Sequence, residues 1–125
     1  MWRLYNRDGL REAKIPTRLI DKTKVDNNNS NVSVPEVLLD NDTTRITFHR
    51  IKPGQNSGWH RHECNYVGYH FQSSKVLVNL KGNATGSISS QKGKATFYDV
   101  GDGFEHDVTV TGDQDLVALE IEYKN

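Results

Sequence analysis

The stretch Lys75–Val100, KVLVNLKGNATGSISSQKGKATFYDV, decides the fold class. It holds three short runs rich in valine, isoleucine, threonine and aromatic residues, separated by the polar segments KGNATG and SSQKGK. Glycine and asparagine in those segments favour tight turns, and short β-branched runs between turns are typical of strands. We therefore predict three strands joined by two hairpin turns.

The same pattern of short strand-like runs separated by turn residues continues on both sides of this stretch, from Val34 to the end of the chain. Further short runs, with turn residues about every 8 to 12 positions, are TTRITFHRI at 43–51, HDVTV at 106–110 and LVALEIEY at 116–123. In the last run Val117, Leu119 and Ile121 share one face, because side chains alternate along a strand. No segment after Val34 keeps a helical apolar period for more than two turns. The pattern predicts an all-β sandwich or barrel.

The first 33 residues differ from the rest. They mix charged and apolar residues and end in the polar run DNNNSN, which indicates a loop. A short helix over 7–14 and an added edge strand over 17–20 both fit, and the strand is our prediction. We divide the chain into an N-terminal extension, 1–33, and one β-domain, 34–125, because a chain of 125 residues has room for a single core.

Charge and cysteine content argue against several classes of function. The 16 basic and 16 acidic residues cancel, so no net field attracts a nucleic acid or a membrane surface. Cys64 is the only cysteine, so no disulfide forms within the chain and a reducing compartment fits. The charged N-terminus lacks the apolar run of a signal peptide, and no stretch approaches membrane-spanning length. We expect a cytoplasmic protein that binds neither nucleic acid nor membrane.

Two histidines two residues apart follow a glycine-containing turn in PGQNSGWHRHECNY, 53–66. On a strand, His60 and His62 point to the same side with Cα atoms about 6.6 Å apart, so both imidazoles can reach one ion. With 5 histidines in 125 residues, a His-x-His triplet arises by chance about 0.2 times per chain, so alone it is weak evidence. His106 adds weight, because it begins another strand behind a Gly-x-Gly turn. Three histidines from two strands would form a compact metal site with positions open for water or substrate.

These motifs resemble those of the cupins. In that family a glycine, five residues and His-x-His form the first motif, and Pro-x-Gly-x-x-His forms the second. Gly54-QNSGW-His60-Arg-His62 is similar to the first, and Gly101-Asp-Gly103-Phe-Glu-His106 is similar to the second, with Gly101 at the proline position. The resemblance covers about residues 35–124 and is strongest to small single-domain, RmlC-like cupins, some of them associated with β-alanine degradation.

The resemblance implies a double-stranded β-helix, or jelly-roll barrel, to which the N-terminal extension is added. It implies a divalent ion, Fe, Mn, Ni or Zn, bound by His60, His62 and His106 inside the barrel. Such an ion would act as a Lewis acid or oxygen-activating centre on a small polar metabolite, as in a dioxygenase, isomerase or lyase. Two other functions stay open: a cupin that binds a small molecule or keeps a metal without turnover, and a purely structural barrel. Because cupin barrels commonly pair through edge strands, we also expect a homodimer.

Besides the glycine at the proline position, the chain departs from the cupin pattern after His62, where the glutamate and the later glycine of the first motif are both missing. Tyr66 stands four residues after His62, where many cupins have a glutamate ligand. It can ligate as a phenolate, hydrogen-bond a metal-bound water or substrate, act as a general acid or base, or pack as an aromatic in the barrel. We take it as the candidate catalytic residue. Cys64, on the same side by strand parity, is either a soft ligand or a small buried residue.

Other polar residues near the motifs have weaker claims. His70 is about 26 Å from His62 along a straight strand, too far for the same ion. We expect polar or interfacial roles for His70 and His49. The side chains that alternate away from the site are those of Trp59, Arg61, Glu105 and Asp107.

Overall fold

The computed structural model describes residues 30–124, so the helix considered over 7–14 and the strand predicted over 17–20 lie outside them. The strands of the described part are β1 (Glu36–Asp40), β2 (Thr44–Ile51), β3 (His60–His62), β4 (Tyr66–His70), β5 (Ser74–Leu80), β6 (Thr85–Ser90), β7 (Ala95–Tyr98), β8 (Phe104–Val110) and β9 (Leu116–Tyr123). One 3-10 turn, η1 (Lys81–Asn83), joins β5 to β6. Within residues 30–124, no helix has the length and apolar character needed to cross a membrane.

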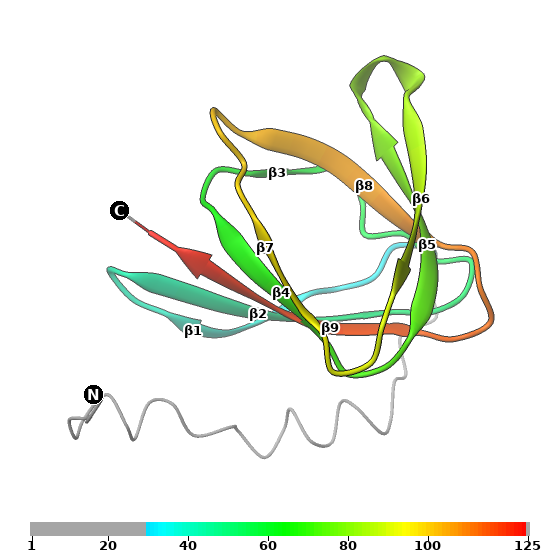
Figure 1. Ribbon diagram of the computed structural model, residues 1–125, viewed down its shortest axis with the longest axis horizontal. Coiled ribbons are helices and arrows are strands. Elements are labelled where there is room, and N and C mark those ends of the chain that lie inside the picture. Colours follow the sequence, from blue (N-terminus) through cyan, green and yellow to red (C-terminus); the bar gives the residue numbers. More distant parts are fainter. Residues whose placement is uncertain (1–29, 125) are drawn as a thin grey trace.

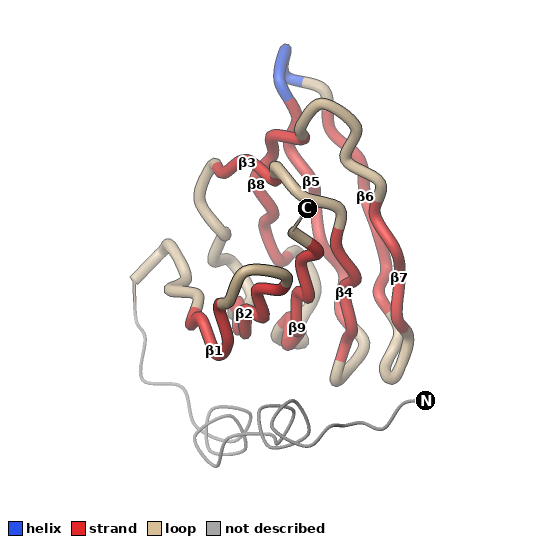
Figure 2. Tube along the Cα trace, turned by 90° about the vertical axis from the view of Figure 1, so that its left-hand side faces the viewer, coloured by secondary structure: helices blue, strands red, loops and turns tan. Residues whose placement is uncertain are grey.

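The strands form two antiparallel sheets that face each other across a common interior (Figure 1). One sheet has five strands in the order β1-β2-β9-β4-β7, and the other has four in the order β3-β8-β5-β6. Figure 2 shows the strands curling around this interior, from β2 and β9 through β4 and β7 to β6, β5, β8 and β3. The predicted all-β jelly-roll barrel is confirmed.

The stretch Lys75–Val100 forms the three predicted strands but only one of the two predicted hairpins. β5 and β6 pair around KGNATG, whereas β7 pairs with β4 in the other sheet. The second hairpin prediction is therefore wrong, because SSQKGK carries the chain from one sheet to the other. This turn bonds to the end of β4 instead: the amide of Gly93 donates to the carbonyl of His70 at 2.7 Å, and the His70 amide donates to the carbonyl of Lys94 at 3.1 Å.

The two faces of β9 pack in different places. Leu116 and Ala118 point into the barrel, where they join a buried cluster contributed by both sheets: Ile51, Val76, Val78 and Val110. Val117 points outward and packs against Phe48, with Leu38, Phe71 and Leu119 around them. The apolar face that the sequence pattern singles out is thus the outer one. The interior face carries the alternate residues, and Glu120 is among them.

A Pro-Gly turn leads the chain into β3. The turn spans residues 52–55, and the amide of Gln55 donates a hydrogen bond to the carbonyl of Lys52 at 2.9 Å. Gly54 has a φ of 84°, as the third residue of a type II turn requires. The segment that follows lies along β8, where the amide of Ser57 donates to the carbonyl of Val108 at 2.8 Å. The chain therefore enters β3 already aligned with β8.

Candidate metal centre

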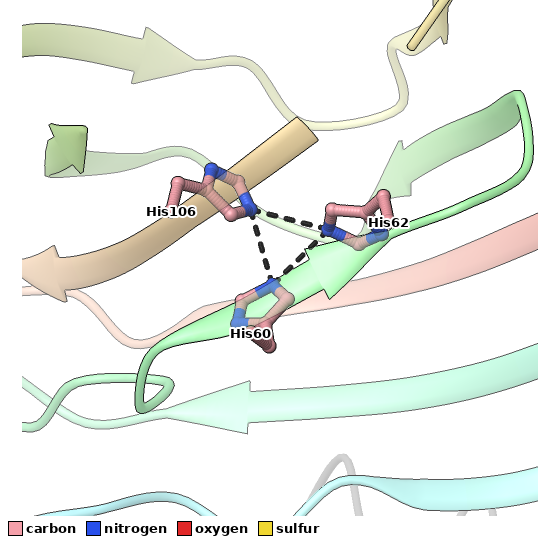
Figure 3. Close-up of side chains that lie close together, drawn as sticks. All are labelled: His60, His62 and His106. Atoms are coloured by element: carbon pink, nitrogen blue, oxygen red, sulfur yellow. Dashed lines mark hydrogen bonds between the residues drawn. The ribbon is translucent and has the colours of Figure 1, made fainter. Parts of the chain in front are cut away.

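Three histidine side chains converge where β3 meets β8 (Figure 3). The antiparallel register puts His60 opposite His106, and His62 lies two residues further along β3 on the same face. The three Nε2 atoms form a triangle with sides of 3.1 Å. His62 and His106 are buried, and His60 is partly buried. The structure thus brings together the three residues that the sequence predicts as metal ligands.

Hydrogen bonds alone do not account for this triangle. A ring nitrogen either donates or accepts, so three mutual contacts cannot all join a donor to an acceptor. His60 Nδ1 lies 2.8 Å from the carbonyl oxygen of Gly58, which only accepts, so the proton of the neutral ring is on Nδ1. The lone pair on His60 Nε2 consequently faces the other two nitrogens. A cation at the centre would satisfy this arrangement.

Burial keeps two of the rings in the form that binds metals. It lowers the pKa of His106 to about 4, with the neighbouring His60 and His62 adding to the shift, and it lowers the pKa of His62 as well. The ring of His62 stacks on Tyr66, with centroids 4.4 Å apart, and lies nearly parallel to Phe104 at 6.4 Å. Both imidazoles are therefore neutral near pH 7, and the ring of His62 is held in place.

The spacing of the triangle fits a metal ion. Two ligands that are each about 2.1 Å from one ion, and at right angles to each other, lie about 3.0 Å apart. The observed Nε2 separations of 3.1 Å are close to that value. Because all three nitrogens come from one side, other coordination positions would remain free.

Beside the triangle lies a carboxylate, that of Glu120, which the sequence did not lead us to predict as part of the site. Glu120 is on the interior face of β9, with its side chain 19% exposed. Its Oε1 is 3.1 Å from His49 Nε2, although the two are not aligned as a hydrogen bond, and its Oε2 is 3.9 Å from His62 Nε2. Burial alone would raise the pKa of Glu120, but His49, followed by His62 and His60, lowers it to about 2. The available signal was a charge in the middle of a strand with apolar residues on both faces.

His60 and His106 of the triangle line a cavity of about 170 Å³ inside the barrel. An engineered cavity of about 150 Å³ holds benzene, so the size suits a small molecule. Val76, Val78 and Val108 belong to its largely apolar wall, and Tyr66 and His70 are among its polar groups. The site can therefore hold a small, partly apolar molecule against an ion.

Comparison with solved structures identifies the architecture. A cupin domain from Bordetella pertussis Tohama I superposes with a TM-score of 0.68 and 29% identity, over 75% of this chain and 95% of that one. The fold is that of the cupins. A cupin-2 domain protein from Shewanella frigidimarina has a TM-score of 0.56 and 15% identity, over 92% and 98% of the two chains. An RmlC-like cupin protein from Desulfovibrio desulfuricans has a TM-score of 0.57 and 18% identity, over 79% and 90%.

Searches of protein-family models and of curated proteins found no match to this chain.

In this cupin barrel Tyr66, at the position expected for a glutamate, packs beside the triangle. It is 4% exposed, and its ring lies between those of His62 and Tyr98, with centroid distances of 4.4 and 4.7 Å. Burial, and then the nearby charge of Glu120, raises the pKa of Tyr66 well above its usual range. The hydroxyl is therefore neutral, which disfavours the phenolate alternative and leaves Tyr66 as a packed aromatic with a hydroxyl group.

The other candidates named from the sequence lie around the triangle. Cys64 is partly exposed between β3 and β4 and does not join the histidine cluster found among the described residues. The sequence predicts polar or interfacial roles for His49 and His70. Both side chains line the cavity of the cupin barrel. Trp59 is 51% exposed, and Asp107 accepts a hydrogen bond from Asn79 at 2.8 Å.

Arg61 points to the opposite side of β3 and ties it to β8. Its guanidinium donates to Glu63 at 2.7 Å, to Glu105 at 3.0 Å and to the carbonyl of Asp102 at 2.6 Å. The same guanidinium lies against Gly103, where an added Cβ would be only 2.0 Å from Arg61 Nη2. These contacts fix the two strands that carry the histidines of the cupin barrel.

Proposed function

We propose that this cupin binds one divalent metal ion through His60, His62 and His106 and acts with it on a small molecule in the barrel. The Nε2 triangle carries the proposal, because three ring nitrogens converge and their spacing suits an ion. Fe, Mn, Ni and Zn all accept imidazole ligands. When bound, the ion would supply Lewis acidity or an oxygen-activating centre.

The cavity limits the molecule that can bind. Its volume of about 170 Å³ suits a compound of on the order of six to ten heavy atoms. Polar groups of that compound would face the histidines, and its carbon skeleton would face the apolar wall. β-Alanine is the first compound to test, because the motifs resemble those of cupins associated with its degradation.

Tyr66 is our candidate for a group that acts on the bound molecule. It lines the cavity and is neutral, so its hydroxyl can donate a hydrogen bond to an oxygen of the ligand. Its ring also supports the imidazole of His62. We assign it no role as a metal ligand.

Variants of Tyr66 separate these roles. We expect Tyr66→Phe to keep metal affinity within about threefold of wild type and Tyr66→Ala to lose about tenfold. Phenylalanine retains the ring that stacks on His62, whereas alanine leaves that imidazole free to turn. Competition titration against a chromophoric chelator measures the metal affinity of both variants. A tenfold loss in Tyr66→Phe would instead show that the hydroxyl, and not only the ring, contributes to metal binding.

Metal removal tests the proposed function directly. The purified protein should contain about one equivalent of divalent metal by mass spectrometric elemental analysis, and stripping it should lower the unfolding temperature. Returning the ion at a hundredfold excess over its Kd should restore about 2.7 kcal/mol of stability, measured by calorimetry. Metal-free protein whose unfolding temperature responds to none of the four ions would contradict the proposal.

A cupin that holds a metal or a ligand without turnover is the second candidate. The replacement of the expected glutamate by Tyr66 favours it. Stripped and reloaded protein should be assayed with β-alanine and other small acids of similar size. Metal-dependent turnover supports an enzyme, whereas metal-dependent stabilisation without turnover supports the second candidate.

We also propose a homodimer in a reducing compartment. Trp59, just before β3, and Phe97, on β7, are 51% and 58% exposed, and both β3 and β7 lie at sheet edges. Pairing at such edges would cover these side chains. The single Cys64 has no partner for a disulfide within the chain. Light scattering at micromolar concentration measures the molar mass of the particle in solution. The mass of a single chain would contradict the proposed homodimer.

A further inference from the structure

A partly buried carboxylate faces the histidine triangle, and within residues 30–124 no lysine or arginine forms an ion pair with it. Among the described residues, the basic groups within 4.0 Å of the oxygens of Glu120 are His49 and His62. A carboxylate that is largely shielded from water is costly unless it is paired. The position of Glu120 therefore favours a cation close by, on the side where the triangle lies.

The surroundings of Glu120 leave its side chain room to reach that cation. Its partner on β4 is Gly68, which has no side chain, and the preceding residue on the same face is the small Ala118. Oε2 is 3.9 Å from His62 Nε2. Oε1 is 3.1 Å from His49 Nε2, so His49 lies against one oxygen, and the other oxygen is on the side of the triangle.

We propose that Glu120 is the fourth protein ligand of the ion and that His49 positions its carboxylate. This inference rests on the proposed function, because it requires an ion at the histidine triangle. Tyr66 fills the position where the resemblance leads us to expect a carboxylate. β9 pairs with β4 and brings a carboxylate to the same interior from the neighbouring strand.

The Glu120→Gln variant tests the proposal with metal ions alone as probes. We expect its affinity for Mn(II) to fall by about tenfold or more. Its affinity for Ni(II) should fall less, because carboxylates suit Mn(II) and imidazoles suit Ni(II). The matched control is Glu122→Gln, which removes a carboxylate two residues further along β9, and it should bind both ions as wild type does.

Cobalt(II) distinguishes a ligand from a charge acting at a distance. Loss of a ligand changes the coordination and moves the visible absorption bands, whereas loss of a nearby charge weakens binding and leaves the bands in place. We expect the bands to move in Glu120→Gln and to stay in Glu122→Gln. His49→Leu, which keeps the carboxylate but removes its support, should weaken binding less than Glu120→Gln. Unmoved bands in Glu120→Gln, or an unchanged Mn(II) affinity, would overturn the proposal.

Unfolding of the metal-free variants identifies a purely structural role. If Glu120 served only as a partner of His49, Glu120→Gln would lower the unfolding temperature of the metal-free protein and leave both metal affinities unchanged. That result would overturn the ligand assignment. A wild-type protein that binds none of the ions would contradict the proposed function instead, so the two failures are distinguishable.

Discussion

His106→Ala is expected to lose metal affinity by more than about 100-fold, which exceeds the effect of removing a group that only supports a ligand. The substitution removes one corner of the Nε2 triangle and leaves His60 and His62 on a single strand. Two imidazoles hold an ion far less firmly than three. Isothermal titration of the stripped protein with Zn(II) and Mn(II) measures the loss.

His70→Ala is the matched control for this variant. His70 also lines the cavity, and burial lowers its pKa as it does for His106, but it lies at the other end of β4 from Tyr66. Both variants delete an imidazole that lines the cavity, buried in His106 and partly buried in His70, so a general loss of packing affects both. Metal affinity should be unchanged in His70→Ala. Equal losses in the two variants would show that lost packing, and not a missing ligand, explains the effect of His106→Ala.

Gly103→Ala is expected to destabilise the protein by about 2 to 3 kcal/mol, the second large effect. Gly103 has a φ of 127°, which L side chains rarely adopt, and an added Cβ would meet the guanidinium of Arg61. Arg61 would have to move and give up its hydrogen bond to the carbonyl of Asp102. Urea unfolding followed by circular dichroism gives the free energy of unfolding.

Gly101→Ala separates backbone strain from the clash. Gly101 belongs to the same turn and has a φ of 57°, but nothing lies within 4 Å of its added Cβ. Its expected cost is about 1 kcal/mol, from the left-handed backbone alone. If the two variants lost equal stability, the position of Arg61 against Gly103 would have no energetic importance.

Local sequence pattern was enough to predict most of the strands of the barrel. Runs such as 75–80 and 116–123 are rich in apolar residues and end near turn residues, and the structure has strands at Ser74–Leu80 and Leu116–Tyr123. Pairing was harder, because alternation says nothing about which strand lies alongside. The segment SSQKGK has the composition of a hairpin turn and nevertheless joins two sheets.

In the candidate site too, some residues follow from local sequence pattern and others depend on how the sheets pack. His60 and His62 share a face by strand parity, and the spacing of His106 from its Gly-x-Gly turn resembles a known motif, so all three could be predicted. Glu120 could not, because its approach to His62 depends on how two sheets fold over each other. No local pattern records that one face of β9 points to the cavity while the more apolar face packs outside.

The shortness of β3 has a consequence for how an ion would leave the protein. β3 has only three residues, lies at the edge of its sheet and pairs on one side with β8. Short edge segments open locally at a lower free energy than the whole domain unfolds. One such opening would withdraw His60 and His62 together while the rest of the barrel stays folded. The lifetime of a bound ion would then be set by the fraying of three residues and not by the kinetic stability of the fold.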